Sequence, residues 1–201
     1  MILPLAAAKH GWHQPQALPN RSFDCGYCGN RVASTQGLKL GAHSDGSGAM
    51  VGSLYICTNC KGPNYFFGDN RYPGVPFGNS VTHTPEELAS LYDEARRSTA
   101  HGCYTGAVLL CRKMLMNIGV NQGAAEGLKF IEYVNHLASK GFIPPNGRQW
   151  VDHIRNKGNE ATHEIALMSE QDAKELILFT EMLLKFIYEF PSMIPKAPPS
   201  P

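Results

Sequence analysis

The chain has 201 residues, enough for one large domain or two small ones. Its 18 basic and 17 acidic residues nearly balance, which argues against a strongly basic nucleic-acid-binding protein and against a membrane-surface protein. The apolar run at residues 1–8 is too short for the core of a signal peptide, and no stretch approaches the ~20 apolar residues that cross a bilayer. We therefore expect a cytoplasmic protein with reduced thiols and no membrane partner.

The first part of the chain lacks helical periodicity. Residues 1–20 contain three prolines, so we expect a loose lead-in. Residues 21–83 are rich in glycine and turn residues, with short apolar-aromatic runs at 53–56 and 64–67. This pattern predicts a small zinc-ribbon-like β module, in which the Gly- and Ser-rich segment 35–52 forms a mobile loop.

Four cysteines in two pairs stand out in this module: Cys25-Gly-Tyr-Cys28 and Cys57-Thr-Asn-Cys60. Each pair is followed at once by residues that tolerate the tight turn of a metal-binding knuckle. Two C-x-x-C pairs supply the four thiolates of a tetrahedral site, with Zn–S distances of ~2.3 Å. The sequence therefore predicts one structural Zn²⁺. The alternatives are two redox dithiols or four unrelated cysteines.

Aromatic and basic residues lie close together after the second cysteine pair. Tyr65 and Phe67 follow Lys61 and precede Arg71, which suggests a stacking surface for single-stranded nucleic acid. The alternative is that these aromatic rings pack the small ribbon against a neighbouring element.

From residue 84 the apolar period becomes helical. A capping box with proline at the first helical position occupies 84–87, a fourth helix is expected from Gly147, and a fifth begins at 169–172. We predict a bundle of about five helices over 84–190, followed by a Pro-rich tail at 191–201. The expected fold class is mainly α, with a small β zinc-ribbon module in front of the bundle.

The fourth predicted helix carries a polar cluster. Arg155, Asn159 and His163 recur every four residues, which places them on one helix face. An arginine that stabilises phosphate charge and a histidine that transfers protons could form a metal-independent phosphodiester site. The same residues could instead form a hydrogen-bonded network that pins the following loop. Arg112 is a candidate member of that network, or a snorkelling side chain at a helix edge.

Several stretches resemble the bacterial family known as domain of unknown function 4145. These are residues 106–115, 137–145, 154–163 and 169–176. The family is similar to the HEPN superfamily of helical bundles, found in restriction, toxin–antitoxin and phage-defence systems. The resemblance maps the catalytic residues of the superfamily onto Arg155, Asn156 and His163. Many HEPN members are metal-independent endoribonucleases that act as dimers, and others are inactive binding or assembly modules, so the resemblance implies one of these roles and a possible homodimer. Here seven residues separate Arg155 from His163, whereas the usual pattern has four to six.

Three functions follow as expectations. The first is a zinc-ribbon and HEPN-like module that binds nucleic acid (RNA or DNA) or a protein partner in bacterial defence or restriction. The second is a metal-independent endoribonuclease that uses Arg155 and His163. The third is a structural or inhibitory subunit of a larger assembly.

Overall fold

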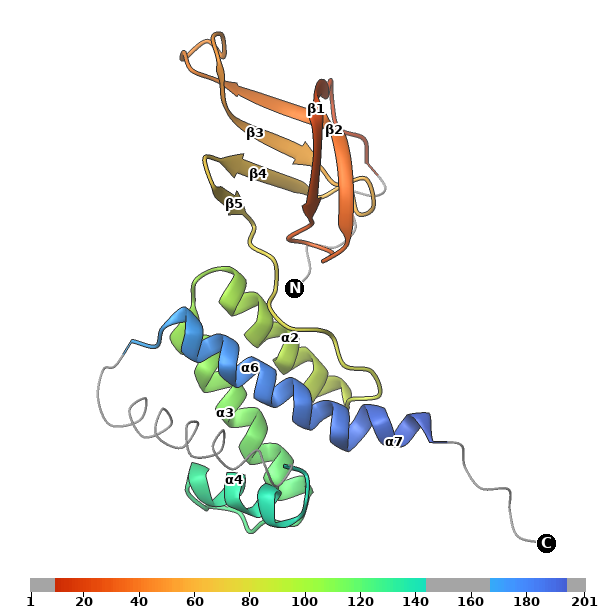
Figure 1. Ribbon diagram of the computed structural model, residues 1–201, viewed down its shortest axis with the longest axis vertical. Coiled ribbons are helices and arrows are strands. Elements are labelled where there is room, and N and C mark those ends of the chain that lie inside the picture. Colours follow the sequence, from red (N-terminus) through yellow and green to blue (C-terminus); the bar gives the residue numbers. More distant parts are fainter. Residues whose placement is uncertain (1–9, 144–166, 195–201) are drawn as a thin grey trace, which may run out of the picture. The chain divides into compact units, whose positions relative to one another are not determined.

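The structure is a computed structural model that describes residues 10–143 and 167–194 (Figure 1). The chain divides between Pro76 and Phe77 into two compact units. The described part of the first is an antiparallel sheet and that of the second is a group of helices. We call them the sheet unit and the helical unit.

The sheet unit contains five strands that lie side by side in chain order. They are β1 (Gln16–Asp24), β2 (Arg31–Gly41), β3 (Met50–Ile56), β4 (Pro63–Phe67) and β5 (Asn70–Tyr72). Each strand pairs antiparallel with the next, so the sheet is a meander (Figure 1). A Cβ atom on Gly37 of β2 would lie 1.8 Å from the backbone oxygen of Leu54 on β3. These two strands therefore approach at a point where only glycine fits.

One face of this sheet carries the aromatic core of the unit. Phe23, Tyr55 and Phe66 are buried, with ring centroids 5.3 to 6.1 Å apart in tilted and edge-to-face pairs. The guanidinium of Arg21 lies 3.9 Å from the ring centroid of Phe66. Such cation–π contact shields the small core from water on that side.

The helical unit contains four α-helices of ten or more residues among the described residues. They are α2 (Glu86–Ala100), α3 (Tyr104–Asn121), α4 (Phe130–Ser139) and α6 (Glu170–Leu184). Helix α6 continues through a π-helical turn, η2 (Lys185–Glu189), into the short α7 (Phe190–Met193). Helix α3 packs against α2, α4 and α6 and is the central element.

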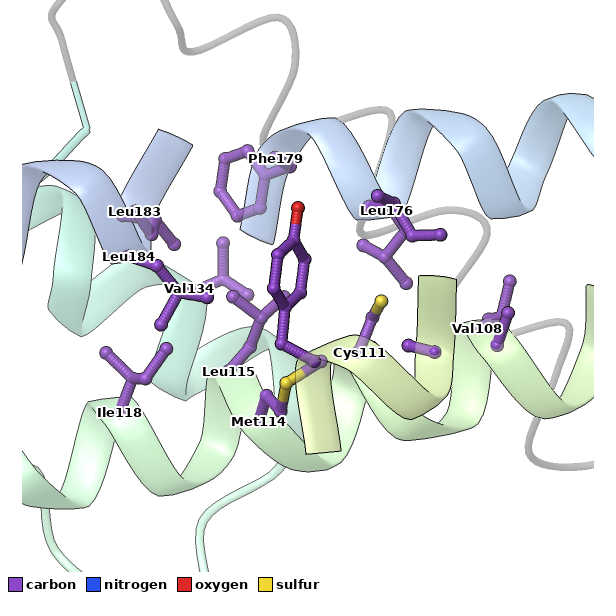
Figure 2. Packing of buried hydrophobic residues seen from close by; sticks show 14 of the residues in the cluster. Val108, Cys111, Met114, Leu115, Ile118, Val134, Leu176, Phe179, Leu183 and Leu184 are labelled. Atoms are coloured by element: carbon purple, nitrogen blue, oxygen red, sulfur yellow. The ribbon is translucent and has the colours of Figure 1, made fainter. Parts of the chain in front are cut away.

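Figure 2 shows how the central helix fills the core. Cys111, Met114 and Leu115 project from α3 and are fully buried. They meet Phe179 of α6 and Val134 of α4, which are also fully buried. A helix that is apolar on most of its circumference needs neighbours on several sides, which explains the position of α3.

The chain enters the helical unit through a short segment held by the polar side chains of Arg96 and Glu181. The side chain of Arg96 donates hydrogen bonds to the backbone oxygens of Phe77 and Gly78, at 3.0 and 2.7 Å. The carboxylate of Glu181 accepts hydrogen bonds from the backbone and side-chain nitrogens of Asn79, at 2.8 and 3.0 Å. We call residues 77–79 the strap, because these bonds fasten them to α2 and α6.

The expected fold class is wrong. Helices account for 41% and strands for 22% of the described residues, so this part of the chain is not mainly helical, and it shows four helices of ten or more residues where five were expected. The sheet is larger than a zinc ribbon because β2 and β3 occupy most of segment 35–52, which was expected to be a loop. β1 begins at Gln16, inside the expected lead-in. The fourth helix predicted from Gly147 lies outside the described residues.

Within the described ranges, no helix combines the length and the apolar character needed to cross a bilayer.

Candidate metal centre and exposed sheet face

The four paired cysteines lie in two hairpin loops at one end of the sheet. Cys25 and Cys28 connect β1 to β2, and Cys57 and Cys60 connect β3 to β4. In a meander, the β1–β2 and β3–β4 connections lie at the same end of the strands. The topology therefore brings together two pairs that are far apart in the sequence.

The two loops have the same backbone hydrogen bonds. The N–H of the first cysteine donates to the oxygen five residues later, in Cys25 to Asn30 (2.9 Å) and in Cys57 to Gly62 (3.0 Å). The oxygen of the first cysteine accepts from the residue four positions later, Gly29 or Lys61. Gly29 and Lys61 both have positive φ, 71° and 62°. The loops are thus two copies of one turn, as expected for paired metal-binding knuckles.

The sulfur atoms form a compact group. All four Sγ atoms lie within 4.8 Å of one another, with Cys25 and Cys60 at 3.7 Å and Cys28 and Cys57 at 3.9 Å. Four sulfurs bound tetrahedrally at ~2.3 Å would be about 3.8 Å apart. A disulfide needs a separation of about 2.05 Å, and all four cysteines are free. The four cysteines can therefore hold one metal ion.

Nearby groups orient the sulfur atoms through hydrogen bonds. The backbone N–H groups of Tyr27 and Cys60 donate to the sulfurs of Cys25 and Cys57, at 3.4 and 3.5 Å. The exposed Asn59 side chain donates to Cys28 at 3.5 Å. Such bonds stabilise the thiolate form, which is the form that binds metal.

Asn64 ties the two cysteine loops together. Its side chain is fully buried. The side-chain oxygen accepts a hydrogen bond from the backbone N–H of Gly26 (2.9 Å). The side-chain nitrogen donates to the sulfur of Cys25 (3.4 Å) and to the backbone oxygen of Gly62 (3.2 Å). One amide from β4 therefore contacts both loops. The sequence reasoning missed Asn64, although a buried asparagine inside a strand is itself unusual.

The thiols differ in their proton affinity. Burial raises the pKa of Cys57 and that of Cys60 above the usual thiol value. Burial acts in the same direction on Cys28, but hydrogen bonds from Asn59 and from the backbone of Asn30 outweigh it and lower its pKa to about 7. Buried thiols without a cation retain their protons, so a metal that binds here must displace them.

The face of the sheet opposite to the aromatic core is apolar; Leu38, Leu40, Phe67 and Tyr72 on it are exposed, whereas Leu54 and Tyr65 are half-buried. We call it the open face and define it by six side chains: Leu38, Leu40, Leu54, Tyr65, Phe67 and Tyr72. Leu38 pairs with Leu54, Leu54 with Tyr65, and Tyr65 with Tyr72, so these four form a row across four strands.

Three aromatic rings on this face form a stack. The rings of Phe67, Tyr65 and Tyr72 follow one another with centroid distances of 6.5 Å and interplanar angles of 17° and 28°. Phe67 is 49% exposed and Tyr72 59% exposed. Tyr65 and Phe67 were candidate binding residues, and the structure brings them together. It adds Tyr72, which the sequence reasoning missed.

Arg71 and Lys61, the two cations expected beside these rings, do not belong to the open face. Arg71 pairs with Phe66, so strand alternation directs it to the opposite face, where it donates to the backbone oxygen of Asp24 at 2.9 Å. Lys61 belongs to the second cysteine loop and lies before β4. The open face, as defined, therefore has no cationic side chain.

The remaining predicted site residues belong to the helical unit. Arg112 is buried on α3, and its guanidinium lies 4.6 Å from the ring centroid of Phe130, while burial lowers its pKa. This burial excludes a snorkelling side chain at a helix edge. The catalytic candidates Arg155, Asn156 and His163, and the binding candidate Asn159, lie outside the described residues.

Comparison with known proteins adds one finding. Residues 93–197, more than half of the chain, match the family model described as Domain of unknown function (DUF4145). The chain belongs to this family. The match includes α3, α4 and α6 and excludes the sheet unit with its four cysteines. No curated protein and no solved structure matches the chain significantly. The family description assigns no activity, so the DUF4145 region does not by itself identify a function.

Proposed function

We propose that this DUF4145 protein is a zinc-dependent binding module that engages a protein partner through the open face of its sheet. The observation that carries the proposal is the group of aromatic and aliphatic side chains on one sheet face, of which Leu38, Leu40, Phe67 and Tyr72 are exposed. A sheet with an apolar face normally buries that face against another layer. Large apolar patches that stay exposed are typical of interaction sites.

The distribution of charge favours a protein over a nucleic acid. Residues 10–76 contain five cationic and three acidic side chains. Four thiolates with one Zn²⁺ contribute two negative charges, which cancel the surplus of two positive charges over residues 10–76. Arg71 and Arg21 lie on the core side of the sheet, away from the stacked rings. Nucleic-acid binding relies on phosphate neutralisation, which the open face does not supply.

The chemistry of the donor set supports zinc. Four thiolates in a closed tetrahedral arrangement are typical of structural Zn²⁺ sites. The sheet unit is small, so the metal contributes much of the free energy that keeps the open face formed. Elemental analysis of the purified protein should find one zinc per chain. A preparation that folds without a stoichiometric metal would overturn this part of the proposal.

A peptide selection tests the partner class. A phage-displayed library of random 12-residue peptides is selected on the immobilised, zinc-loaded full chain, and the selected peptides are titrated by fluorescence anisotropy. Tyr65→Ser and Phe67→Ser should each weaken binding at least five-fold. Val51→Ser, which removes an exposed apolar side chain from the opposite face, should not. Failure to select any peptide, or equal effects of the three substitutions, would contradict the proposal.

A second titration tests nucleic acid. Labelled single-stranded U20 and dT20 should not bind the same preparation at 150 mM salt. Binding that weakens steeply with salt would replace our proposal with a nucleic-acid interface. The RNA is also recovered after incubation in EDTA. Cleavage that disappears in His163→Ala would instead support the endoribonuclease expectation.

A further inference from the structure

The four cysteines of the metal centre differ in their access to solvent. Cys25 and Cys57 have no exposed surface and Cys60 is 8% exposed, whereas Cys28 is half-buried. The two residues that follow Cys28 in its loop are exposed. A small molecule that approaches the centre from solvent therefore reaches Cys28 before the other three.

The hydrogen bonds of the sulfur atoms show the same difference. The sulfur of Cys28 accepts from the side chain of Asn59, which lies at the surface. The sulfur of Cys25 accepts instead from the side chain of Asn64, which is fully buried. A surface side chain can turn away from its sulfur when another molecule arrives, but a side chain packed in the interior cannot.

A second sulfur lies close to that of Cys28. The Sγ atom of Cys57, in the other cysteine loop, is 3.9 Å away. A disulfide needs a separation of about 2.05 Å, so the two sulfurs would have to move together by about 1.9 Å. Such a bond would join the same two loops that the metal ion joins.

Bound zinc keeps all four cysteines in their reactive form. A thiol that coordinates a metal ion is deprotonated, and the thiolate is the nucleophile in cysteine chemistry. When zinc is bound, the four sulfurs are therefore equal in protonation. Their exposure then decides which of them reacts with an oxidant, and exposure favours Cys28.

We propose that Cys28 is the site at which hydroperoxides oxidise the zinc centre, and that Cys57 completes the reaction as the resolving cysteine. The Cys28 thiolate attacks one peroxide oxygen and becomes a sulfenic acid, while the O–O bond breaks and the other oxygen takes a proton and leaves. The Cys57 thiolate then attacks the Cys28 sulfur, forms the disulfide and expels hydroxide, which takes a second proton. The two sulfurs lose the two electrons that the peroxide gains. Zinc loses two of its four ligands and is released.

This inference rests on the zinc centre of the proposed function and is independent of the open face. Peptide mapping tests it on the full chain with Cys103→Ser, because Cys103 is exposed and does not belong to the centre. Elemental analysis first establishes one zinc per chain. One equivalent of hydrogen peroxide is then added, with or without dimedone, which traps sulfenic acids. Trypsin cuts after Arg31 and Lys39, so the two cysteine loops fall on separate peptides.

Dimedone should be found on Cys28, and without dimedone the peptides should be joined by a Cys28–Cys57 disulfide. One zinc per chain should pass to a chromophoric chelator. Dimedone on another cysteine, a disulfide within either C-x-x-C pair, or retention of zinc would overturn the inference and leave the zinc centre intact. A preparation without zinc before peroxide is added would overturn the zinc centre, and this inference with it.

Asn59→Ala tests the site of attack without removing a metal ligand. Loss of its hydrogen bond leaves the Cys28 sulfur more exposed and more nucleophilic, so zinc release in excess hydrogen peroxide should become about two- to three-fold faster. Thr58→Ala, at the neighbouring exposed position of the same loop, should leave the rate unchanged. Equal rates in both variants and in the parent chain would show that the peroxide attacks a sulfur other than Cys28.

Discussion

At the scale of single residues, one amide couples the two halves of the metal centre. Asn64 is buried and bonds both to the first cysteine loop and to the second. Outer groups of this kind orient metal ligands, and their loss usually lowers metal affinity by about 10- to 100-fold.

Asn64→Asp tests this role. The carboxylate keeps an acceptor for the N–H of Gly26, but it removes the donor to Cys25 and places a negative charge beside the thiolates. We expect zinc affinity to fall at least ten-fold in a competition titration against a chromophoric chelator. Asn70→Asp makes the same chemical change at an exposed position of β5 and should leave affinity unchanged. Equal affinities for both variants would exclude a positioning role.

Glu181 offers a test of pH dependence. It is buried in α6. Burial tends to raise its pKa, but hydrogen bonds from Lys185 and Asn79 outweigh this, so the pKa is lower than usual. A carboxyl group with a lowered pKa stabilises the fold fully above its unfolded-state pKa of ~4.3. The stabilisation is lost as the pH falls through the lower, folded-state value.

Glu181→Gln should therefore lower the free energy of unfolding by about 1–3 kcal/mol at pH 7. The difference from the natural chain should shrink below about pH 4. Urea unfolding followed by circular dichroism at 222 nm measures it. Glu126→Gln, at an exposed loop position, serves as the control. A difference that stays constant between pH 7 and pH 3.5 would show that the charge of Glu181 has no role.

At the scale of elements, glycine has opposite effects in strand and helix. Gly37→Ala would place a methyl group against the backbone of β3, so we expect the free energy of unfolding to fall by about 2 kcal/mol or more. Gly106→Ala in α3 meets no atom within 4 Å and should stabilise the helix by about 0.5–1 kcal/mol. Differential scanning calorimetry measures both. Gly37→Ala with an unchanged melting temperature would contradict the close approach of β2 and β3.

The predictability of elements also depends on local contacts. The structure confirms the predicted helix start at Ser169 and shows a capping box there. The Ser169 hydroxyl accepts from the N–H of Asp172, and the Asp172 carboxylate accepts from that of Ser169. The prediction of a capping box at Thr84 is wrong. Pro85 takes the N-cap position of α2, and the Thr84 hydroxyl donates to the oxygen of Val81 instead. A capping motif in the sequence identifies the start of a helix, but the contacts of the neighbouring residues determine which residue occupies the N-cap position.

The candidate site was predictable from the sequence only in part, because some of its residues are brought together by contacts that are distant in the chain. The role of the four cysteines as metal ligands could be predicted because the C-x-x-C spacing is a local pattern typical of a metal-binding turn. The open face was not, because strand register decides which side chains share it. Leu38 and Leu40 alternate as strand residues should, but the glycine and serine residues around them favoured a loop. Asn64 acts on partners up to 39 residues away, which no local pattern reveals.

At the scale of the whole molecule, the two units should respond separately to loss of metal. The sheet unit has a small core of aromatic residues and cysteines, whereas the helical unit has an extensive aliphatic core of its own. A strong chelator should therefore abolish hydrogen-exchange protection at Tyr55 and Phe66 and leave protection at Leu115 and Phe179. Simultaneous loss of protection in both units would show that they fold as one.

The strap has a mechanical consequence. Any pull transmitted along the chain from the sheet unit reaches Phe77, Gly78 and Asn79 first, and their bonds to Arg96 and Glu181 anchor them to α2 and α6. The load is thus shared between two helices from the start, and several hydrogen bonds must break before either helix can be unwound. Tension arriving along the chain from the sheet unit would therefore have to break these hydrogen bonds before it acted on α2 or α6.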